Sequence, residues 1–195
     1  MIKTAEFATS VGNLNQLRDF GAPEIAVAGK SNVGKSSFIN FICNKKLAKT
    51  SKEPGRTRLL NYFNINKGQF FLVDLPGYGF AKVSDAEKAK WGTLIESYFR
   101  TSTRLKNVFL LLDIRHTPTA DDMQMLKYLY FYRLPFTIIA TKGDKLSRSA
   151  CMRRRKEIAD YIGVGVDDVI ICSSLNKTGG EAIYSRIDSI LAFTE

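Results

Sequence analysis

Apolar positions along the chain follow two different periods. Short, nearly continuous apolar runs, typical of buried strands, alternate with longer segments in which apolar residues recur every three to four positions, as on one face of a helix. The runs predict strands at residues 24–28, 60–65, 69–74, 108–113, 135–141 and 168–172. The longer segments predict helices at residues 36–43, from residue 85 onward, and at 119–133, 147–162 and 180–192.

This alternation predicts an α/β fold, because strands joined by helices pair in parallel and are covered on both faces. Asn-Lys-Gly at residues 66–68 is a hairpin signal and predicts that one strand is antiparallel. We expect a three-layer domain, a mostly parallel six-stranded sheet with one antiparallel edge strand and helices on both faces. Residues 1–22 are expected to be an N-terminal extension packed on a domain of residues 23–195.

The composition is that of an ordinary globular domain, with 195 residues of which 45% are hydrophobic and 25% charged. No apolar run approaches the roughly 20 residues of a membrane span, and the N-terminus lacks the features of a signal peptide. The three cysteines are far apart, and a single histidine cannot form a multi-histidine metal site. We therefore expect a cytoplasmic protein with reduced thiols and no membrane span. We also expect it to be monomeric.

The positive charge is concentrated in two segments of the chain. The sequence holds 29 Lys and Arg against 19 Asp and Glu, a formal net charge of +10. Residues 45–58 carry six cations and one anion, and residues 142–156 carry seven cations and one anion. Such focused positive potential is typical of proteins that bind a polyanion, and a solvated face that only aids solubility is the alternative for either segment.

Residues 29–36 match the phosphate-loop pattern GxxxxGK[ST], directly after a predicted strand and at the start of a predicted helix. Its glycines let the backbone curl so that N–H groups face an anion at the helix N-terminus. Lys35 can reach the terminal phosphates, and the Ser36 hydroxyl can ligate Mg²⁺. The expected phosphate-binding residues are Gly29, Lys30, Ser31, Asn32, Val33, Gly34, Lys35 and Ser36. The loop alone does not separate an ATPase or a small-molecule kinase from a GTPase.

Asp144 predicts that the base is guanine. A carboxylate at this position, after a predicted strand, can accept hydrogen bonds from both the N1–H and the exocyclic amine of guanine. Adenine lacks that pair of donors, so an unpaired Asp144 would penalise ATP. The stem of Lys142 can lie across the base, and the backbone after the last strand can donate to the guanine O6. The expected base-binding residues are Thr141, Lys142, Gly143, Asp144, Cys172, Ser173 and Ser174.

Two further segments are expected to respond to the γ-phosphate. Asp74, at the end of a predicted strand, can act on Mg²⁺ through water, and the Gly77 N–H can lie near the γ-phosphate. Thr57 can complete the Mg²⁺ shell only when a γ-phosphate is present. We expect metal ligation by Ser36, Thr57 and Asp74, and catalytic contributions from Lys35, Thr57 and Gly77. The other nucleotide contacts expected here are Gly55, Arg56, Arg58, Leu59, Leu75 and Pro76.

With these motifs in this order, the chain resembles the translation-factor-like TRAFAC GTPases, and specifically the bacterial EngB (YihA/YsxC) family, over nearly its whole length. The resemblance rests on GKSNVGKSS (29–37), PGRTRLLNYF (54–63), DLPGYGFAKVS (74–84), DIRHTP (113–118), TKGDKLS (141–147) and SSLNKTG (173–179). It implies an EngB-type G domain that binds GTP, GDP and Mg²⁺, turns GTP over slowly, and acts in large ribosomal subunit assembly and normal septation. The implied partner is the precursor of the large subunit, with its rRNA and ribosomal proteins. Gly143 departs from the family pattern, which often has a bulkier small residue there.

The mechanism of hydrolysis is less defined by the sequence. Residues 74–77 form a DxxG motif, and many GTPases align the attacking water with a glutamine directly after its glycine. In this chain that position is Tyr78, so we expect slow intrinsic hydrolysis. Asn32 stands where potassium-activated GTPases similar to this chain place a potassium ligand, and bracing of the loop is its alternative role. Arg56 either neutralises developing charge or contacts RNA. His116 is expected to have a structural hydrogen-bonding role.

Three functions therefore compete. The first is a GTP-driven switch that acts on an assembling ribosomal subunit. The second is an RNA-binding assembly protein whose GTP pocket only modulates affinity. The third, a P-loop ATPase or nucleoside kinase, is disfavoured by Asp144.

Overall fold

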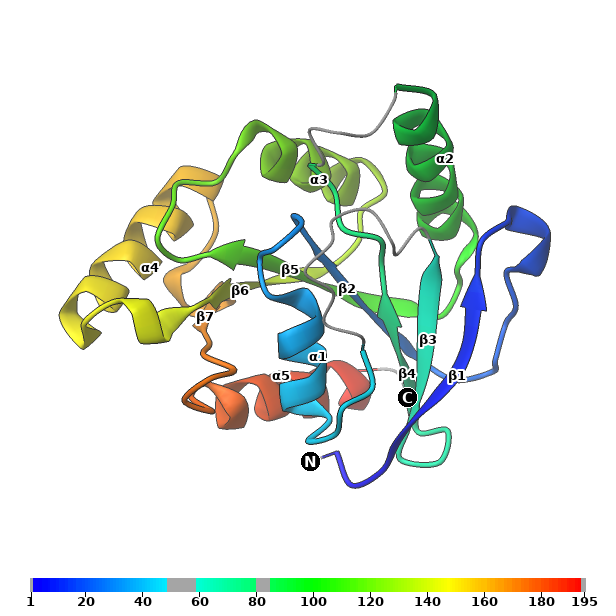
Figure 1. Ribbon diagram of the computed structural model, residues 1–195, viewed down its shortest axis with the longest axis horizontal. Coiled ribbons are helices and arrows are strands. Elements are labelled where there is room, and N and C mark those ends of the chain that lie inside the picture. The colour runs from blue at the N-terminus through cyan, green and yellow to red at the C-terminus, as the bar shows by residue number, and fades with distance from the viewer. Residues whose placement is uncertain (1, 49–58, 80–84, 194–195) are drawn as a thin grey trace.

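The computed structural model describes residues 2–48, 59–79 and 85–193, and gives only the backbone of Leu14 and of residues 85–91. Its centre is a seven-stranded sheet with the strand order β1-β3-β4-β2-β5-β6-β7 (Figure 1). The strands are β1 (Ala5–Val11), β2 (Glu24–Gly29), β3 (Leu60–Ile65), β4 (Phe70–Asp74), β5 (Leu105–Asp113), β6 (Phe136–Thr141) and β7 (Val169–Ile171). The helices are α1 (Lys35–Ile42), α2 (Asp85–Thr101), α3 (Ala120–Phe131), α4 (Arg148–Ile162) and α5 (Gly180–Ala192).

The α/β class and the three-layer arrangement are confirmed. A hydrophobic core lies on each face of the sheet, and successive residues of a strand face these two cores in turn, because side chains alternate along a strand. In β2, Ala26 and Ala28 face the core beneath α2, α3 and α4, whereas Ile25 and Val27 face the core beneath α1 and α5. Helices therefore cover both faces of the sheet, and the bounds of the predicted elements differ from the observed ones by at most three residues.

The largest boundary error is at the start of β5. The apolar run predicted a strand beginning at Val108, and the strand begins at Leu105. Lys106 and Asn107 interrupt the apolar pattern there. The backbone nevertheless continues beside β2, where Ile25 lies opposite Asn107.

The predicted number of six strands is wrong by one, because β1 adds a seventh. This strand pairs antiparallel with β3 from Ala5 opposite Ile65 to Val11 opposite Leu60. Only Ala5 and Val11 are buried within it, so its sequence shows no clear alternation of apolar and polar residues. Among the strands of the described residues, β3 alone runs against the others; it lies between β1 and β4 and is not the edge strand that was expected.

The carboxyl ends of the parallel strands gather at one edge of the sheet. Here β2 leads into the phosphate-loop motif, β4 ends at Asp74, β5 ends at Asp113 and β6 ends at Thr141. Ligands of such sheets bind outside the carboxyl ends of the strands. The fold thus brings segments that are distant in sequence to one edge, where the candidate site lies.

Candidate nucleotide-binding site

The phosphate-loop motif forms a tight turn between β2 and α1. Gly34 is the N-cap of α1 and has a φ of 107°, in the left-handed region that favours glycine. Gly29 lies so close to its neighbours that an added Cβ would be 2.8 Å from Val33 Cγ1 and 3.2 Å from the Leu111 carbonyl oxygen. Close backbone packing and a helix N-terminus are the features that an anion-binding loop requires.

Lys35, the lysine of this loop, forms an ion pair with Asp74 at the end of β4. Their side chains are 10% and 5% exposed, so the pair is nearly enclosed by protein. The structure therefore brings together a residue expected to bind phosphate and a residue expected to act on the metal. Ser36 follows Lys35 in the first turn of α1, on the same loop.

Residues 75–78 pack against the phosphate loop. The Leu75 N–H donates to the Val27 carbonyl at 3.0 Å, and both the N–H and the hydroxyl of Ser31 donate to the Tyr78 carbonyl, at 2.9 and 3.1 Å. Pro76 and Gly77 are buried in this segment. A Cβ on Gly77 would lie 3.3 Å from Ser31 Oγ, so the glycine permits the close approach. The two segments expected to contact the terminal phosphates thus touch each other.

Lys30, another loop residue, pairs with Asp121 of α3 at 3.3 Å. Gly79 follows this segment with a φ of 78°, and a Cβ there would lie 2.7 Å from Lys30 Cε. The phosphate loop, the segment that follows β4 and the start of α3 therefore meet around Lys30.

The side chain of Tyr78 is engaged by α3. Its hydroxyl donates to Asp122 Oδ1 at 2.8 Å, and the other Asp122 oxygen accepts from the N–H and hydroxyl of Thr119, at 2.8 and 2.7 Å. Burial, and then the charge of Asp122, raise the pKa of Tyr78 well above its usual value. Sequence reasoning missed Asp122, which also forms the capping box of α3 with Thr119.

The base-binding loops are also joined directly. Ser173 Oγ donates to Asp144 Oδ1 at 2.7 Å, and this hydrogen bond is the main reason why the pKa of Asp144 lies below its usual value. Lys145 lies 3.2 Å from the other carboxylate oxygen. The Gly143 N–H donates to the Cys172 carbonyl at 3.0 Å. Asp144 is therefore ionised and oriented by the loop that follows β7, which continues through the half-buried Ser174.

Two residues at the end of β6 tie the base-binding loop to the phosphate loop. Thr141 Oγ1 donates to the Val33 carbonyl at 2.8 Å, and Lys142 Nζ donates to the Asn32 carbonyl at 2.8 Å. Lys142 and Asn32 both have positive φ, 62° and 64°. The base and phosphate halves of the site are thus held at a fixed spacing.

Asp113 is a site residue that sequence reasoning missed. Its carboxylate lies 2.9 Å from Lys142 Nζ and 2.7 Å from an Arg115 guanidinium nitrogen. Burial opposes ionisation of Asp113, but the hydrogen bonds from Arg115 and Lys142 outweigh it and hold the pKa of Asp113 far below its usual range. Asp113 and Thr141 are register partners in neighbouring strands, which brings Asp113 beside Lys142. A sequence alone does not supply this register.

We expect Asp113→Asn to weaken GDP and GTP binding equally, by about three- to tenfold, because Lys142, the residue expected to lie along the base, loses a charged partner. Titration of a fluorescent nucleotide measures the effect. In a Lys142→Ala background Asp113→Asn should change nucleotide affinity little, because the lysine it acts on is already gone. The losses of affinity in the two single variants should therefore not add in the double variant. Additive losses would show that Asp113 does not act through Lys142.

Some expected site residues fall outside the described residues. These are Gly55, Arg56, Thr57 and Arg58, together with the cations Lys49 and Lys52. Leu59, the first described residue after this gap, lies against Gly12, whose added Cβ would be 2.7 Å from Leu59 Cδ2. Within the described part of the same basic segment, Lys45 and Lys46 are exposed, and Lys45 Nζ donates to the Ala5 carbonyl.

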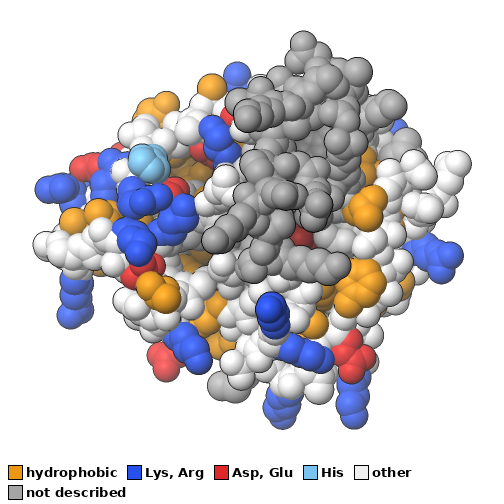
Figure 2. Space-filling view, in the orientation of Figure 1, with side chains coloured by type: hydrophobic (Ala, Val, Ile, Leu, Met, Phe, Trp, Pro, Cys, Tyr) orange, Lys and Arg blue, Asp and Glu red, His pale blue; other side chains and the backbone are white. Residues whose placement is uncertain are grey.

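In the second basic segment, residues 142–156, two of the cations bind other parts of the protein rather than facing solvent alone. Arg154 donates to the Ile114 carbonyl at 3.1 Å and pairs with Glu157. Arg155 donates to the Val169 carbonyl at 2.7 Å and pairs with Asp167. Lys and Arg side chains still gather on the face over α4 (Figure 2). Its exposed cations are Lys145, Arg148, Arg153 and Lys156.

His116 is exposed, and its backbone N–H donates to the Asp113 carbonyl at 3.0 Å.

The three cysteines are free and buried, and burial raises the pKa of Cys172 to about 12. No helix among the described residues is long and apolar enough to cross a membrane.

The parallel sheet, the phosphate loop after β2, the DxxG motif after β4 and the aspartate after β6 define a P-loop GTPase domain. A family model described as a 50S ribosome-binding GTPase matches residues 24–142. A probable GTP-binding protein EngB of Mycoplasma mycoides subsp. mycoides is 49% identical over 193 residues, which cover 98% of each chain. The corresponding protein of Desulfosudis oleivorans is 44% identical over 196 residues, 100% of this chain and 99% of its own. This chain belongs to the EngB family, as its motifs predicted.

Solved structures show the same fold. The crystal structure of a probable GTP-binding protein engB superposes with a TM-score of 0.71 at 21% identity, over 87% of this chain and 98% of that one. A point variant of Aquifex aeolicus Era bound to GDP·AlF4⁻ superposes with a TM-score of 0.69 at 21% identity, over 88% of this chain and 56% of that one. The three-layer P-loop GTPase fold is therefore confirmed.

Proposed function

We propose that this protein is a slow, Mg²⁺-dependent GTPase that acts as a switch in large ribosomal subunit assembly and thereby supports normal septation. The observation that carries the nucleotide assignment is the ionised Asp144, held by Ser173 beside a lysine that is anchored on the phosphate loop. Membership of the EngB family and the description of the matching family model support the ribosomal role. The protein acts in the cytoplasm as a monomer, with residues 1–22 as an extension that contributes β1 to the domain of residues 23–195.

The nucleotide is bound at both ends of this site. Asp144 accepts hydrogen bonds from guanine, and the stem of Lys142 lies along the base. The backbone N–H groups of the phosphate loop surround the phosphates at the start of α1. Lys35 then exchanges its carboxylate partner, Asp74, for phosphate oxygens. Gly77 contributes its N–H to the γ-phosphate.

The residues of the site fit Mg²⁺. The Ser36 hydroxyl and the buried Asp74 carboxylate are hard oxygen ligands, and Thr57 is the proposed third protein contact. Among the described residues no group of three or more His, Cys, Asp or Glu could hold a metal ion. Mg²⁺ commonly uses one or two carboxylates together with substrate phosphates, so a sparse set of ligands suits it. When bound, the ion neutralises charge that develops on the phosphates.

The slow rate follows from the role of Tyr78. Its hydroxyl is occupied by Asp122, so this side chain holds the DxxG segment on α3 rather than aligning a water. Asn32 would hold a potassium ion, which would stimulate the hydrolysis that the missing glutamine leaves slow. Bracing of the loop is the alternative role for Asn32, and hydrolysis rates in potassium and in sodium separate the two.

We expect Tyr78→Phe to lower the free energy of unfolding by about 1 kcal/mol while leaving the GTPase rate within about twofold, because it removes one buried hydrogen bond and no catalytic group. Urea unfolding and phosphate release measure the two effects. Thr119→Val is the control that leaves Tyr78 in place, since it removes another hydroxyl that donates to Asp122, together with the N-cap of α3. A large loss of rate in Tyr78→Phe alone would give the Tyr78 hydroxyl a direct part in hydrolysis.

The proposed switch couples GTP to RNA affinity. The basic segment of residues 45–58 contains Thr57, so binding of Thr57 to Mg²⁺ and GTP orders cations that are then ready to dock on RNA at a lower entropic cost. An RNA-binding assembly protein whose GTP pocket only modulates affinity is the second candidate, supported by the same charges.

Co-sedimentation with large-subunit precursors in GTP analogue, in GDP and without nucleotide tests the switch. We expect tighter binding with the GTP analogue and a smaller difference after neutralisation of Lys45 and Lys46. Neutralisation of Arg153 and Lys156, exposed cations on α4, is the control and should weaken both states alike. Equal binding in all states would reject the switch. Intact assembly after hydrolysis is abolished would favour the second candidate.

A further inference from the structure

An exposed aromatic patch lies at the end of α3. It consists of Lys127, Tyr130, Phe131 and Arg133, and we call it the α3 patch. Phe131 is 77% exposed and Tyr130 is 55% exposed, which is unusual for large aromatic side chains. Because α3 begins beyond the carboxyl end of β5 and returns to the amino end of β6, the patch and the phosphate loop lie at opposite edges of the sheet.

The two exposed rings are held in place by their neighbours. The Tyr130 ring lies 5.4 Å from that of Phe136 at an interplanar angle of 88°, and the Phe131 ring lies 5.0 Å from that of Tyr132 at 90°. Tyr132 in turn packs against Phe99 of α2, with ring centroids 6.3 Å apart. Rings that are positioned in advance lose little conformational entropy when a ligand stacks on them.

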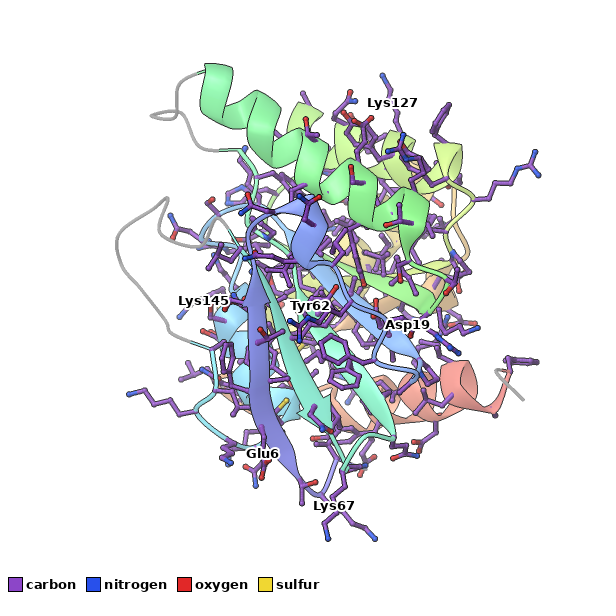
Figure 3. All side chains as sticks on the ribbon, turned by 90° about the vertical axis from the view of Figure 1, so that its right-hand side faces the viewer. Glu6, Asp19, Tyr62, Lys67, Lys127 and Lys145 are labelled. Carbon is purple, nitrogen blue, oxygen red and sulfur yellow. The ribbon has the colours of Figure 1, made fainter. Side chains whose placement is uncertain are left out.

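The surroundings of these rings are positively charged. Residues 123–141 contain Lys127 and Arg133 and no Asp or Glu. Lys127 precedes Phe131 by one helical turn and therefore shares its face, and it points into solvent (Figure 3). The Arg133 side chain is exposed. Arg133 lies two residues after the end of α3, and its backbone φ is 53°. Glu96 and Arg100 of α2 add one anion and one cation beside Tyr132.

We propose that the α3 patch binds single-stranded RNA, with bases stacked on Tyr130 and Phe131 and phosphates paired with Lys127 and Arg133. Exposed aromatic rings flanked by cations match the two features of a single strand, its free base faces and its charged backbone. A duplex hides its base faces, and an apolar protein surface would need no cations. The inference goes beyond the proposed switch, because the patch is remote from the γ-phosphate and binds RNA equally with GTP and with GDP.

Fluorescence anisotropy of the full chain with a labelled, unstructured oligoribonucleotide tests this proposal. We expect Phe131→Ala to weaken binding at least about fivefold, Phe131→Trp to preserve it, and Phe131→Leu to resemble Phe131→Ala, since leucine keeps apolar area but has no aromatic face. Tyr161→Ala is the matched control, because Tyr161 on α4 is 54% exposed and lies outside the patch. Unchanged nucleotide affinity in each variant shows that the fold is intact.

Lys127→Ala and Arg133→Ala should each flatten the log-log salt dependence by about 0.7, the value for one phosphate contact of a single strand. A duplex of the same sequence should bind more weakly and should not respond to Phe131→Ala. Undiminished RNA binding by Phe131→Ala, or equal losses for duplex and single strand, would overturn the proposal. If Phe131→Leu binds the oligoribonucleotide as the wild type does, bases do not stack on Phe131 and the proposal is overturned. Nucleotide-dependent binding to subunit precursors would survive each of these failures, so the proposed function is tested separately.

Discussion

Replacement of Asp144 by asparagine is expected to lower the affinity for GTP and GDP at least about 30-fold, equivalent to ~2 kcal/mol. In the proposed site the carboxylate accepts from both the N1–H and the amine of guanine, whereas an amide presents one acceptor and one donor. Its NH₂ group therefore faces a donor of the base. Xanthine carries a carbonyl oxygen in place of that amine, so we expect Asp144→Asn to bind xanthine nucleotides more tightly than the wild type does.

Calorimetric titration with GTP, xanthosine triphosphate and ATP measures this change of preference. Lys145→Ala is the control, because Lys145 contacts Asp144 from an exposed position and should change affinity little. Ser173→Ala should fall between the two, since it removes the hydroxyl that orients Asp144 without changing what the base meets. If Asp144→Asn binds GTP as the wild type does, guanine is recognised elsewhere.

The sequence predicted the elements that have a strong apolar period. In β2 and β6 nearly every position is buried, and α5 shows a single buried face of Ile183, Ile187 and Ile190. It did not predict β1, whose burial is confined to its two ends. Such a strand is defined by its partner β3 rather than by its own pattern.

Local motifs made Lys35, Asp74 and Asp144 candidate site residues, each from the few residues around it. The contacts between loops were not predictable. Asp113 meets Lys142 through strand register, and Asp122 meets Tyr78 through the packing of α3. Both are carboxylates outside any nucleotide-binding motif, so their parts in the site become visible only in three dimensions.

Loss of the Lys35 side chain is expected to have the largest effect of all. Lys35→Ala should lower GTP affinity by at least about 100-fold, because charge-assisted contacts to the terminal phosphates disappear. It should also lower the free energy of unfolding of the nucleotide-free protein by about 3–5 kcal/mol, since Asp74 would remain as an unpaired buried charge. Fluorescent-nucleotide titration and urea unfolding measure the two effects.

A second substitution separates the two effects. In Lys35→Met combined with Asp74→Asn neither charge remains, so stability should largely return while GTP affinity does not. A double variant as unstable as Lys35→Ala would show that packing, not charge, explains the loss. A nucleotide-free Lys35→Ala that unfolds as the wild type does would mean that Lys35 and Asp74 are not paired in solution.

Asp74→Asn alone tests the exchange of partners directly. In the proposed binding mode a phosphate displaces Asp74 from Lys35, and the cost of breaking this enclosed pair reduces the affinity of the wild type for nucleotide. With asparagine at this position the ammonium group is free to pair with phosphate, so we expect tighter GTP binding in the absence of Mg²⁺. The same variant should lose most of the gain in affinity that Mg²⁺ gives the wild type, because the carboxylate proposed to act on the ion is gone. Weaker binding than the wild type in the absence of Mg²⁺ would contradict the exchange and would leave Asp74 a role in the metal site alone.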